Sequence, residues 1–170
     1  MNVNNHLIIF IKNPELGHVK TRLAASVGDE KALAVYQRLL KITRDQTQLA
    51  PCIRHLCYSN HVDENDDWDR EYFHKHVQSD GDLGARMLGA LQGAFNREAK
   101  KVVIIGSDCP EITTEIISDA FASLDKYDVV VGPAKDGGYY LIGMTCPLPM
   151  LFKNKKWSTD SVFSDTVLDL

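Results

Sequence analysis

The first loop that could do chemistry is basic and follows a short apolar run. It reads Lys12-Asn-Pro-Glu-Leu-Gly-His-Val-Lys-Thr-Arg-Leu23, and Gly17 allows the backbone to turn closely. A phosphate bound between a strand and a helix amino terminus gains from free N–H groups, and Lys20 and Arg22 add full positive charges. The loop matches neither the Walker A pattern nor G-x-G-x-x-G, so a solvated basic loop is an equally weighted alternative.

The second loop places a carboxylate directly after the most apolar run of the chain. This loop is Gly106-Ser-Asp-Cys-Pro110. Mg²⁺ and Mn²⁺ prefer oxygen ligands and often bridge one or two carboxylates to substrate phosphates, so a single aspartate suffices. We therefore predict that Asp108 is a metal ligand. The alternative is an aspartate that caps a helix or stabilises a turn.

The third loop combines one carboxylate with flexible backbone, in Gly132-Pro-Ala-Lys-Asp-Gly-Gly-Tyr-Tyr-Leu-Ile-Gly143. Asp136 is a candidate to coordinate metal, to hold a sugar hydroxyl or to act as a base, and a simple β-turn is the alternative. The pair Asp80-Gly-Asp82 favours helix capping. Trp157 is suited either to stack on a sugar or base or to anchor the last helix.

The histidines and cysteines give weaker signals. His74 and His76 are two apart, and His55 and His61 are isolated in the sequence, so surface or packing roles are favoured over metal binding. The four cysteines show neither a C-x-x-C pair nor zinc-finger spacing, and we interpret them as reduced thiols, mostly in the core.

The elements that must position these loops alternate between strand and helix patterns. Apolar runs predict strands at 6–11, 53–58, 101–105, 128–131 and 139–144. Apolar spacings of three and four predict a short helix from near Thr21 and further helices over 32–42, over 83–95, from Thr113 or Thr114 to Leu124, and within 158–170. The acidic stretch 60–75 is interpreted as solvated loop with a short helix.

This alternation predicts an α/β fold with a mostly parallel sheet and right-handed crossovers. Ligands of such sheets bind outside the carboxyl ends of the strands. The loops after Ile11 and after Ile105 are therefore expected to line one crevice.

Composition and size bound the remaining possibilities. With 170 residues, 44% hydrophobic and 25% charged, the chain has the make-up of one ordinary folded domain. The net charge of -4 gives no broad basic field, so we expect no nucleic-acid partner. The first apolar run is too short for a signal peptide or a membrane span, which makes the cytoplasm the expected location.

Five stretches together carry a resemblance to a known family. They are Phe10-Ile-Lys-Asn-Pro14 with Gly17-His-Val-Lys-Thr-Arg-Leu23, Gln78-Ser-Asp-Gly-Asp-Leu-Gly-Ala-Arg-Met87, the Asp108 loop, the Asp136 loop, and Trp157-Ser-Thr159. In this combination the chain resembles a bacterial family of glycosyltransferases with the A-type, nucleotide-diphospho-sugar transferase fold. Some members of that family are labelled arsenosugar-biosynthesis glycosyltransferases.

The resemblance implies a Rossmann-like, three-layer α/β/α domain and assigns roles to individual residues. It implies Mg²⁺ or Mn²⁺ as cofactor, bound by Asp108, with Asp136 as the catalytic candidate. Nucleotide contacts are expected from Lys12, Gly17, Lys20, Thr21, Arg22, Gln78, Gly81 and Arg86. Contacts to the transferred sugar are expected from Gly137, Gly138, Tyr139 and Trp157.

Three functions follow as hypotheses. The leading one is transfer of a sugar from a nucleotide diphosphate to an unknown small-molecule acceptor. The alternatives are nucleotidyl transfer from a nucleoside triphosphate with release of pyrophosphate, as in phospholactate guanylyltransferases of this fold, and a non-catalytic nucleotide-binding module. Family members usually continue beyond the helix after the Trp-Ser-Thr stretch, with an acidic segment near the carboxyl end, so we interpret residues 1–170 as one domain that is short at its carboxyl end. A second metal ligand or a wall of the acceptor site would then be missing.

Overall fold

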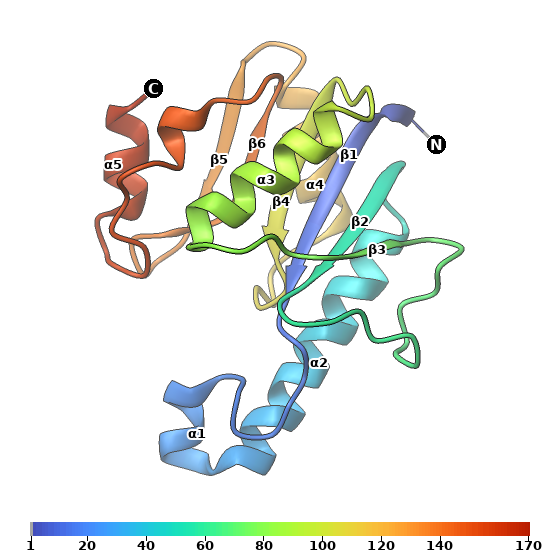
Figure 1. The fold of residues 1–170 in the computed structure, drawn as a ribbon, viewed down its shortest axis with the longest axis vertical. Coiled ribbons are helices and arrows are strands. Elements are labelled where there is room, and N and C mark those ends of the chain that lie inside the picture. The colour runs from blue at the N-terminus through green and yellow to red at the C-terminus, as the bar shows by residue number, and fades with distance from the viewer. Residues whose placement is uncertain (1) are drawn as a thin grey trace.

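The computed structural model describes residues 2–170 and contains one six-stranded sheet (Figure 1). Its strand order is β3-β2-β1-β4-β6-β5. The strands are β1 (Asn2–Ile11), β2 (Cys52–Tyr58), β3 (His74–Val77), β4 (Lys101–Gly106), β5 (Val129–Pro133) and β6 (Tyr139–Met144). The apolar runs that predicted strands in the sequence form β1, β2, β4, β5 and β6.

The sheet is mostly parallel, as predicted, with one reversed strand. β1 pairs in parallel with β2 and with β4, and β2 pairs in parallel with β3. β6 is antiparallel to both of its neighbours, β4 and β5. β5 consequently points in the same direction as β4, so the carboxyl ends of β1, β4 and β5 lie along one edge of the sheet.

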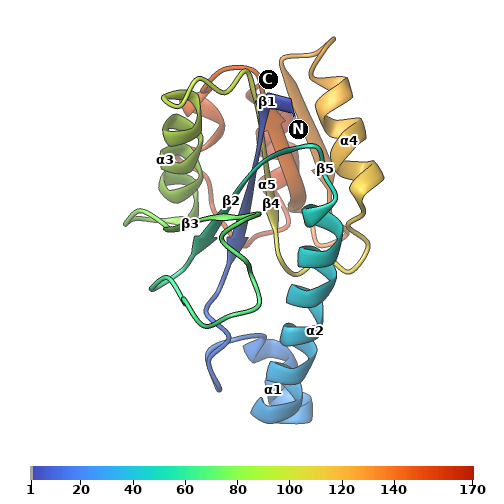
Figure 2. The ribbon, with the colours of Figure 1, turned by 90° about the vertical axis from the view of Figure 1, so that its right-hand side faces the viewer.

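Helices cover both faces of this sheet (Figure 2). α3 lies on one face, while α2 and α4 lie on the other, and the α1–α2 end extends beyond the sheet. The helices are α1 (Thr21–Val27), α2 (Asp29–Gln48), α3 (Leu83–Phe95), α4 (Thr114–Ser123), the 3-10 turn η1 (Pro149–Leu151) and α5 (Val162–Leu168). The expected three-layer α/β/α architecture is therefore confirmed.

Two capping predictions are also confirmed. The Asp82 side chain accepts a hydrogen bond from Ala85 N at the start of α3, and Thr113 accepts one from Ile116 N at the start of α4. β5 extends through Pro133, past its predicted end, because proline is tolerated in an edge strand whose N–H side faces no partner. α5 is shorter than the predicted helical tail.

The prediction for residues 60–75 is wrong in two respects. The segment before β3 forms turns rather than a short helix, and it is not simply solvated. Trp68 and Phe73 are both buried and pack edge to face, with ring centroids 4.8 Å apart. Lys75 is also buried, and its ammonium lies 2.7 Å from the Asp66 carboxylate. The acidic stretch therefore encloses a paired lysine, which lowers the cost of burying that charge.

The histidines are not isolated in the fold. His55 Nε2 lies 3.0 Å from His6 Nδ1, and His55 Nδ1 lies 3.1 Å from His76 Nε2. These three side chains come from adjacent strands and form a hydrogen-bonded chain of imidazoles on the α3 face of the sheet. Only 2% of His6 and 5% of His55 is exposed. The buried position of His55 agrees with the predicted packing role, although its isolation in the sequence does not extend to the fold.

This imidazole chain predicts acid-sensitive stability. Burial, followed by the neighbouring imidazoles and Arg97, lowers the pKa of His55 from 6.5 to about 3. Between these values the unfolded chain takes up a proton that the folded chain does not, so stability is full above pH 6.5 and falls as the pH decreases towards 3. We expect His55→Gln to remove about 1.4 kcal/mol per pH unit from that slope.

Urea unfolding at several pH values between about 4 and 6 measures this effect. His18→Gln is the matched control, because His18 is exposed and lies outside the imidazole chain. The control should keep the slope of the unchanged protein. A His55→Gln slope equal to that of the control would contradict the prediction.

The structure also bears on the expected state of the cysteines and on the expected absence of a membrane span. All four cysteines are free thiols, and Cys52 and Cys57 are buried, whereas Cys146 is exposed. Within residues 2–170, none of the helices has the length and apolar character needed to cross a membrane.

Candidate functional site

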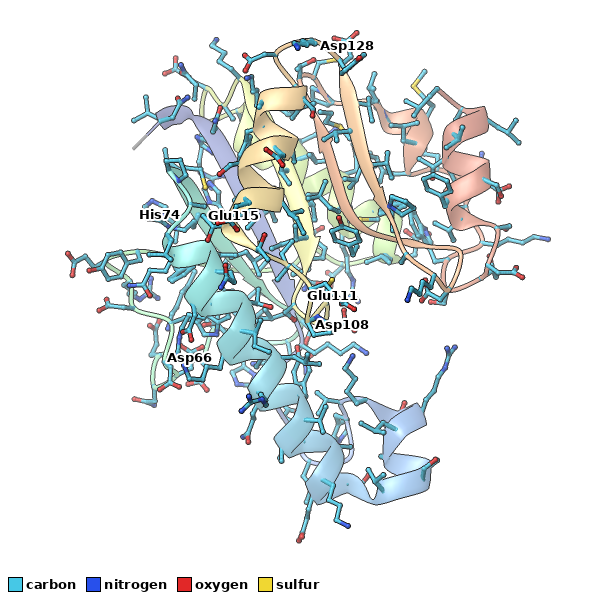
Figure 3. The ribbon with its side chains drawn as sticks, turned by 180° about the vertical axis from the view of Figure 1, so that it is seen from behind. Asp66, His74, Asp108, Glu111, Glu115 and Asp128 are labelled. Carbon is cyan, nitrogen blue, oxygen red and sulfur yellow. The ribbon has the colours of Figure 1, made fainter. Side chains whose placement is uncertain are left out.

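The candidate site lies at the edge of the sheet where β1, β4 and β5 end. The basic loop 12–20 follows β1, the Asp108 loop follows β4, and the turn 134–138 joins β5 to β6. Neighbouring strands are about 4.8 Å apart, so the ends of β1, β4 and β5 span roughly 15 Å of this edge. Asp108 and Glu111 lie at this end of the sheet, and Asp128 lies at the opposite end (Figure 3).

Lys20 and Asp108 meet across this edge. The Lys20 ammonium lies 3.0 Å from Asp108 Oδ2, although the two residues are far apart in the sequence. The Asp108 side chain is 62% exposed, and exposed ion pairs contribute little to folding stability, about 0 to 1 kcal/mol. The pair therefore brings two opposite charges together at a solvent-accessible point without serving mainly to hold the fold.

The backbone at Lys20 is unusual. Its φ of 48° and ψ of 43° place it in the left-handed region, where a non-glycine residue costs about 1 to 2 kcal/mol. Such strain tends to occur at functional sites, where the surrounding structure holds it in place. Here the residue immediately precedes α1, and the conformation accompanies the approach of its side chain to Asp108.

The carboxylates of this site suit a metal ion that is also bound by a substrate phosphate better than an ion bound by protein ligands alone. Over residues 2–170, no three His, Cys, Asp or Glu side chains gather closely enough to hold a metal. Asp108 supplies one exposed carboxylate, which lies 3.0 Å from the Lys20 ammonium. A single carboxylate fits a metal ion that takes its other ligands from water and phosphate. Asp108 thus remains compatible with Mg²⁺ or Mn²⁺, and its role as a ligand remains a prediction.

The other basic side chains of the first loop face solvent. Lys12 and Arg22 are exposed, and neither pairs with a carboxylate in the part of the chain that the structure describes. Gly17 lies in the turn that separates them, and Thr21 is the first residue of α1. Because α1 has only seven residues, charged side chains rather than a helix dipole must supply any attraction for phosphate.

The predicted nucleotide contacts Gln78 and Arg86 have structural partners of their own. Gln78 Nε2 donates to Ile11 O at 3.2 Å and to Cys57 O at 2.9 Å, so this amide ties the ends of β1 and β2 together. Arg86 Nε donates to Gly81 O at 2.9 Å and holds the turn before α3. Sequence reasoning did not indicate these roles, and the nucleotide contacts themselves remain predictions.

The turn after β5 is joined to the carboxyl-terminal segment. Asp136 is exposed, and its Oδ1 accepts a hydrogen bond from Gly138 N at 3.1 Å, as in a simple turn. Phe163 N donates to Gly137 O at 2.8 Å. The predicted sugar contacts 137–139 and Trp157 are therefore carried by chain segments that support each other.

Two of the predicted sugar contacts carry buried polar atoms that lack partners. Tyr139 Oη and Trp157 Nε1 form no hydrogen bond within the described chain. Both side chains pack against the hydrophobic cluster beneath α3, and burial raises the pKa of Tyr139, which keeps its hydroxyl protonated. A buried unpaired donor is a candidate for a hydrogen bond to water or to a ligand.

Gly137 provides a test of how tightly the turn is packed. Its φ is +83°, and a methyl group added there would overlap with the backbone of Asp160. We expect Gly137→Ala to destabilise the fold by about 3 kcal/mol, from backbone strain together with the clash. The midpoint of urea unfolding measures this change.

Gly17→Ala is the matched control for that substitution. Gly17 has a similar φ of +77°, but an added methyl group would meet only Asp29 Oδ2, at an ordinary contact distance of 3.7 Å. It should cost about 1 to 2 kcal/mol from strain alone. Equal losses of stability in the two variants would show that the turn does not press against Asp160.

Sequence reasoning missed two buried residues that hold the first loop. The Asn13 side chain donates to His61 O at 2.9 Å and accepts from Asn60 N at 3.0 Å, which joins the loop to the chain after β2. Tyr36 in α2 contacts both Lys12 and Ser107 through its hydroxyl. The helical apolar spacing marked Tyr36 only as a core residue, so its polar role had no sequence signal.

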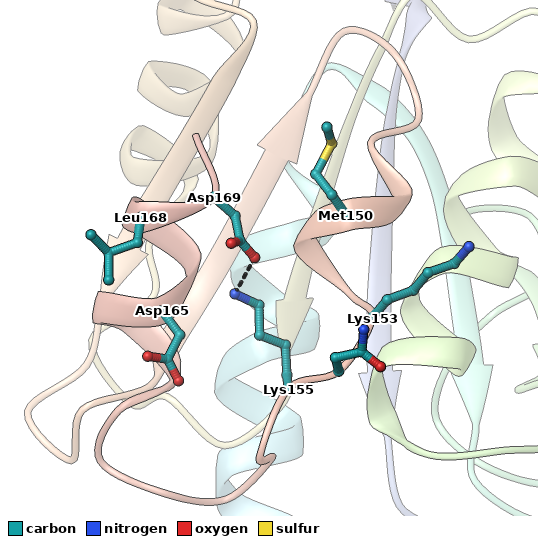
Figure 4. Close-up of a pocket in the computed structure, with 7 residues that line it drawn as sticks. Met150, Lys153, Lys155, Asp165, Leu168 and Asp169 are labelled. Atoms are coloured by element: carbon teal, nitrogen blue, oxygen red, sulfur yellow. Dashed lines mark hydrogen bonds and ion pairs between the residues drawn. The ribbon is translucent and has the colours of Figure 1, made fainter.

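A hollow of about 530 Å³ lies beside η1 and α5 (Figure 4). The ion pair between Lys155 and Asp169, at 2.7 Å, forms part of its wall. The residues that line it are Met150, Lys153, Asn154, Lys155, Asp165, Leu168 and Asp169. None of the three candidate loops contributes to this lining.

Comparison with known proteins places the chain in a family. A family model described as an uncharacterised protein conserved in bacteria, DUF2064, matches residues 39–159, which is more than half of the chain. The chain belongs to the DUF2064 family. The match includes the Gln78 to Arg86 segment and the loops of Asp108 and Asp136, and it begins after the basic first loop. No curated protein matches the DUF2064 chain.

Solved structures extend the comparison to the whole fold. The crystal structure of a "putative nucleotide-diphospho-sugar transferase" from Desulfovibrio desulfuricans G20 is 33% identical to the DUF2064 chain, with a TM-score of 0.88. The match covers 98% of this chain and 74% of that one, so it includes the first loop as well. Nothing in these matches concerns arsenosugars, and that part of the resemblance stays a prediction.

Two more distant structures share the fold alone. A cytidylyltransferase from Leptospira borgpetersenii serovar Hardjo-bovis (strain JB197) is 14% identical, with a TM-score of 0.53, and the match covers 90% of this chain and 69% of that one. The 4-diphosphocytidyl-2C-methyl-D-erythritolsynthase from Anaerococcus prevotii DSM 20548 is also 14% identical, with a TM-score of 0.58 and coverage of 95% and 82%. The predicted fold class of the DUF2064 chain is thus confirmed.

Proposed function

We propose that this protein is a metal-dependent transferase that moves a sugar from a nucleotide diphosphate to a small-molecule acceptor. The observation that supports this most directly is the contact between Lys20 and Asp108, which joins the basic loop after β1 to the acidic loop after β4. The name of the 33%-identical relative, a nucleotide-diphospho-sugar transferase, supports the same substrate class. The distant cytidylyltransferase structures agree with a nucleotide-derived substrate on this fold.

In this proposal the side chains of the first loop bind the diphosphate. Lys12, Lys20 and Arg22 hold the phosphate oxygens and stabilise the negative charge that develops on the leaving nucleoside diphosphate. Asp108 would hold Mg²⁺ or Mn²⁺, and the bound ion would neutralise further phosphate charge as a Lewis acid. Because the Lys20 ammonium and the metal ion both carry positive charge, the Asp108 carboxylate would lie next to the diphosphate without net repulsion.

The turn between β5 and β6 would border the transferred sugar. Asp136 is exposed at the same edge as Asp108, where it can accept a hydrogen bond from a sugar hydroxyl or take a proton from the acceptor. The unpaired Tyr139 hydroxyl and Trp157 indole N–H are donors suited to sugar oxygens.

A panel of substrates tests this function. We would incubate the purified protein with UDP-, GDP- and CDP-activated sugars and with the four nucleoside triphosphates, with and without Mn²⁺, and measure binding by calorimetry and products by chromatography. Because the panel contains no acceptor, we expect slow release of a nucleoside diphosphate that requires Mn²⁺, with water taking the sugar in place of the acceptor. Release of pyrophosphate from a triphosphate would show nucleotidyl transfer instead, and binding without any turnover would refute the transferase assignment.

A further inference from the structure

The hydroxyl of Tyr36 lies where the two charged loops approach each other. Tyr36 belongs to α2, is only 3% exposed, and packs in the cluster between the sheet and α2. Figure 3 shows α2 lying over the sheet and passing beyond the end at which Asp108 is labelled. The Tyr36 side chain therefore reaches the loops from the buried side.

Three hydrogen bonds converge on this one oxygen atom. Lys12 N donates to Tyr36 Oη at 2.9 Å, Tyr36 Oη donates to Lys12 O at 3.1 Å, and Ser107 Oγ lies 3.1 Å from Tyr36 Oη. A tyrosine hydroxyl has one proton to give and two lone pairs to accept with. Since its proton goes to Lys12 O, Ser107 must be the donor in the third contact, and all the groups are then satisfied.

These bonds connect the residues next to the proposed ligands. Lys12 is the first residue after β1, and Ser107 immediately precedes Asp108. Ser107 is held further by Thr43 Oγ1, which donates to Ser107 O at 3.3 Å, and by its own N–H, which donates to Phe10 O at 3.2 Å. Tyr36 and Thr43, which lie about two turns apart on α2, thus attach both loops to the same helix.

We propose that Tyr36 is a positioning residue that sets the distance between the phosphate-binding loop and Asp108, and that it thereby couples metal binding to nucleotide binding. This inference rests on the proposed function for the identity of the two ligands. Tyr36 does not touch substrate in this arrangement. It acts through Lys12 and Ser107, whose positions it fixes relative to each other.

Coupling of this kind has a measurable form. If Mn²⁺ raises the affinity for a nucleotide sugar by some factor, the nucleotide sugar must raise the affinity for Mn²⁺ by the same factor. Tyr36→Phe keeps the ring and removes the hydroxyl. We expect it to reduce this factor about tenfold, because the two loops no longer keep a fixed spacing. The affinity for the nucleotide sugar without Mn²⁺ should change much less.

The control is Tyr58→Phe, which removes another buried hydroxyl from the same hydrophobic cluster. Tyr58 is fully buried, and its hydroxyl donates to the Asp66 carboxylate, so it touches neither loop. It should leave the coupling factor unchanged even though it costs stability. A loss of coupling in Tyr58→Phe as large as in Tyr36→Phe would overturn the inference.

Amide hydrogen exchange in the free protein provides a second, ligand-independent measurement. Tyr36→Phe should increase exchange in both 12–20 and 107–111, whereas Ser107→Ala should increase it mainly in 107–111. Faster exchange in both segments together with the smaller coupling factor supports the inference. Unchanged exchange in either segment in Tyr36→Phe overturns it.

The two measurements also separate this inference from the proposed function. The coupling factor is measured with the tightest-binding nucleotide sugar of the panel described above and with Mn²⁺. If the unchanged protein binds none of those nucleotide sugars, the proposed function fails. The exchange measurement then decides by itself whether Tyr36 holds the two loops in position.

Discussion

Replacing Asp108 with asparagine should weaken the binding of a nucleotide sugar in the presence of Mn²⁺ by about a hundredfold. The amide keeps the size of the side chain but lacks the charge that a hard cation requires from its ligand. Without Mn²⁺ the affinity should stay the same or rise slightly, because Lys20 loses its partner at 3.0 Å and becomes available to phosphate. Calorimetric titration with and without Mn²⁺ measures both affinities.

Glu111→Gln provides the matched control for this substitution. Glu111 is an exposed carboxylate of the same loop, and its removal changes the net charge by the same amount (Figure 3). A general electrostatic effect would change the affinity for the nucleotide sugar equally in the two variants. Metal-dependent affinity that survives in Asp108→Asn would exclude Asp108 as the ligand of the ion.

Replacing Lys20 with glutamine should produce the opposite pattern for the two ligands. Affinity for the nucleotide sugar should fall by about ten- to a hundredfold, since a charge-assisted contact to phosphate contributes about 1.5 to 3 kcal/mol. Affinity for Mn²⁺ alone should rise, because the carboxylate of Asp108 no longer has an ammonium group beside it. Glutamine is no better suited than lysine to the left-handed backbone, so stability should change little.

The control in this case is Lys41→Gln. Lys41 is an exposed lysine of α2 that pairs with Asp45 at 2.6 Å, one helical turn away. This variant removes the same charge from the exposed side of α2, where the ammonium pairs with Asp45 and with neither loop. Weaker binding of Mn²⁺ in Lys20→Gln, or equal nucleotide affinities in the two lysine variants, would contradict a shared role of Lys20 and Asp108.

Much of the architecture could be predicted because the central strands are long apolar runs. β4 and the second half of β1 are buried runs of mostly β-branched and other apolar residues, which favours strands covered on both faces. The rule that ligands bind at the carboxyl ends of parallel strands then placed the loops of Lys20 and Asp108 at one edge. The sequence could not reveal that these two side chains form an ion pair, since that depends on side-chain conformations.

The features that escaped prediction depend on strand neighbours. β3 has the sequence His-Lys-His-Val and lies at an edge of the sheet, so it carries no apolar run by which to recognise it. The imidazole chain joins side chains from three strands and becomes visible only once their order is known. Trp68 and Phe73 are buried within an acidic stretch whose composition indicates solvent exposure.

The sequence indicated those candidate site residues whose side chains carry a charge. It did not indicate the residues that hold the loops in place through hydrogen bonds. Lys20, Asp108 and Asp136 carry charges at strand ends, where position and residue type agree. Tyr36 and Asn13 act through hydrogen bonds to backbone atoms that lie distant in the sequence. No spacing rule connects such a side chain to its partner, so only the folded arrangement identifies them.

Helix α1 buries none of its seven residues, and it extends with part of α2 beyond the body of the sheet (Figure 1). Substitutions on its surface therefore cost almost nothing in packing energy, unlike substitutions in β1 or β4. The segment that follows the basic loop is thus free to diverge in sequence while the fold stays intact.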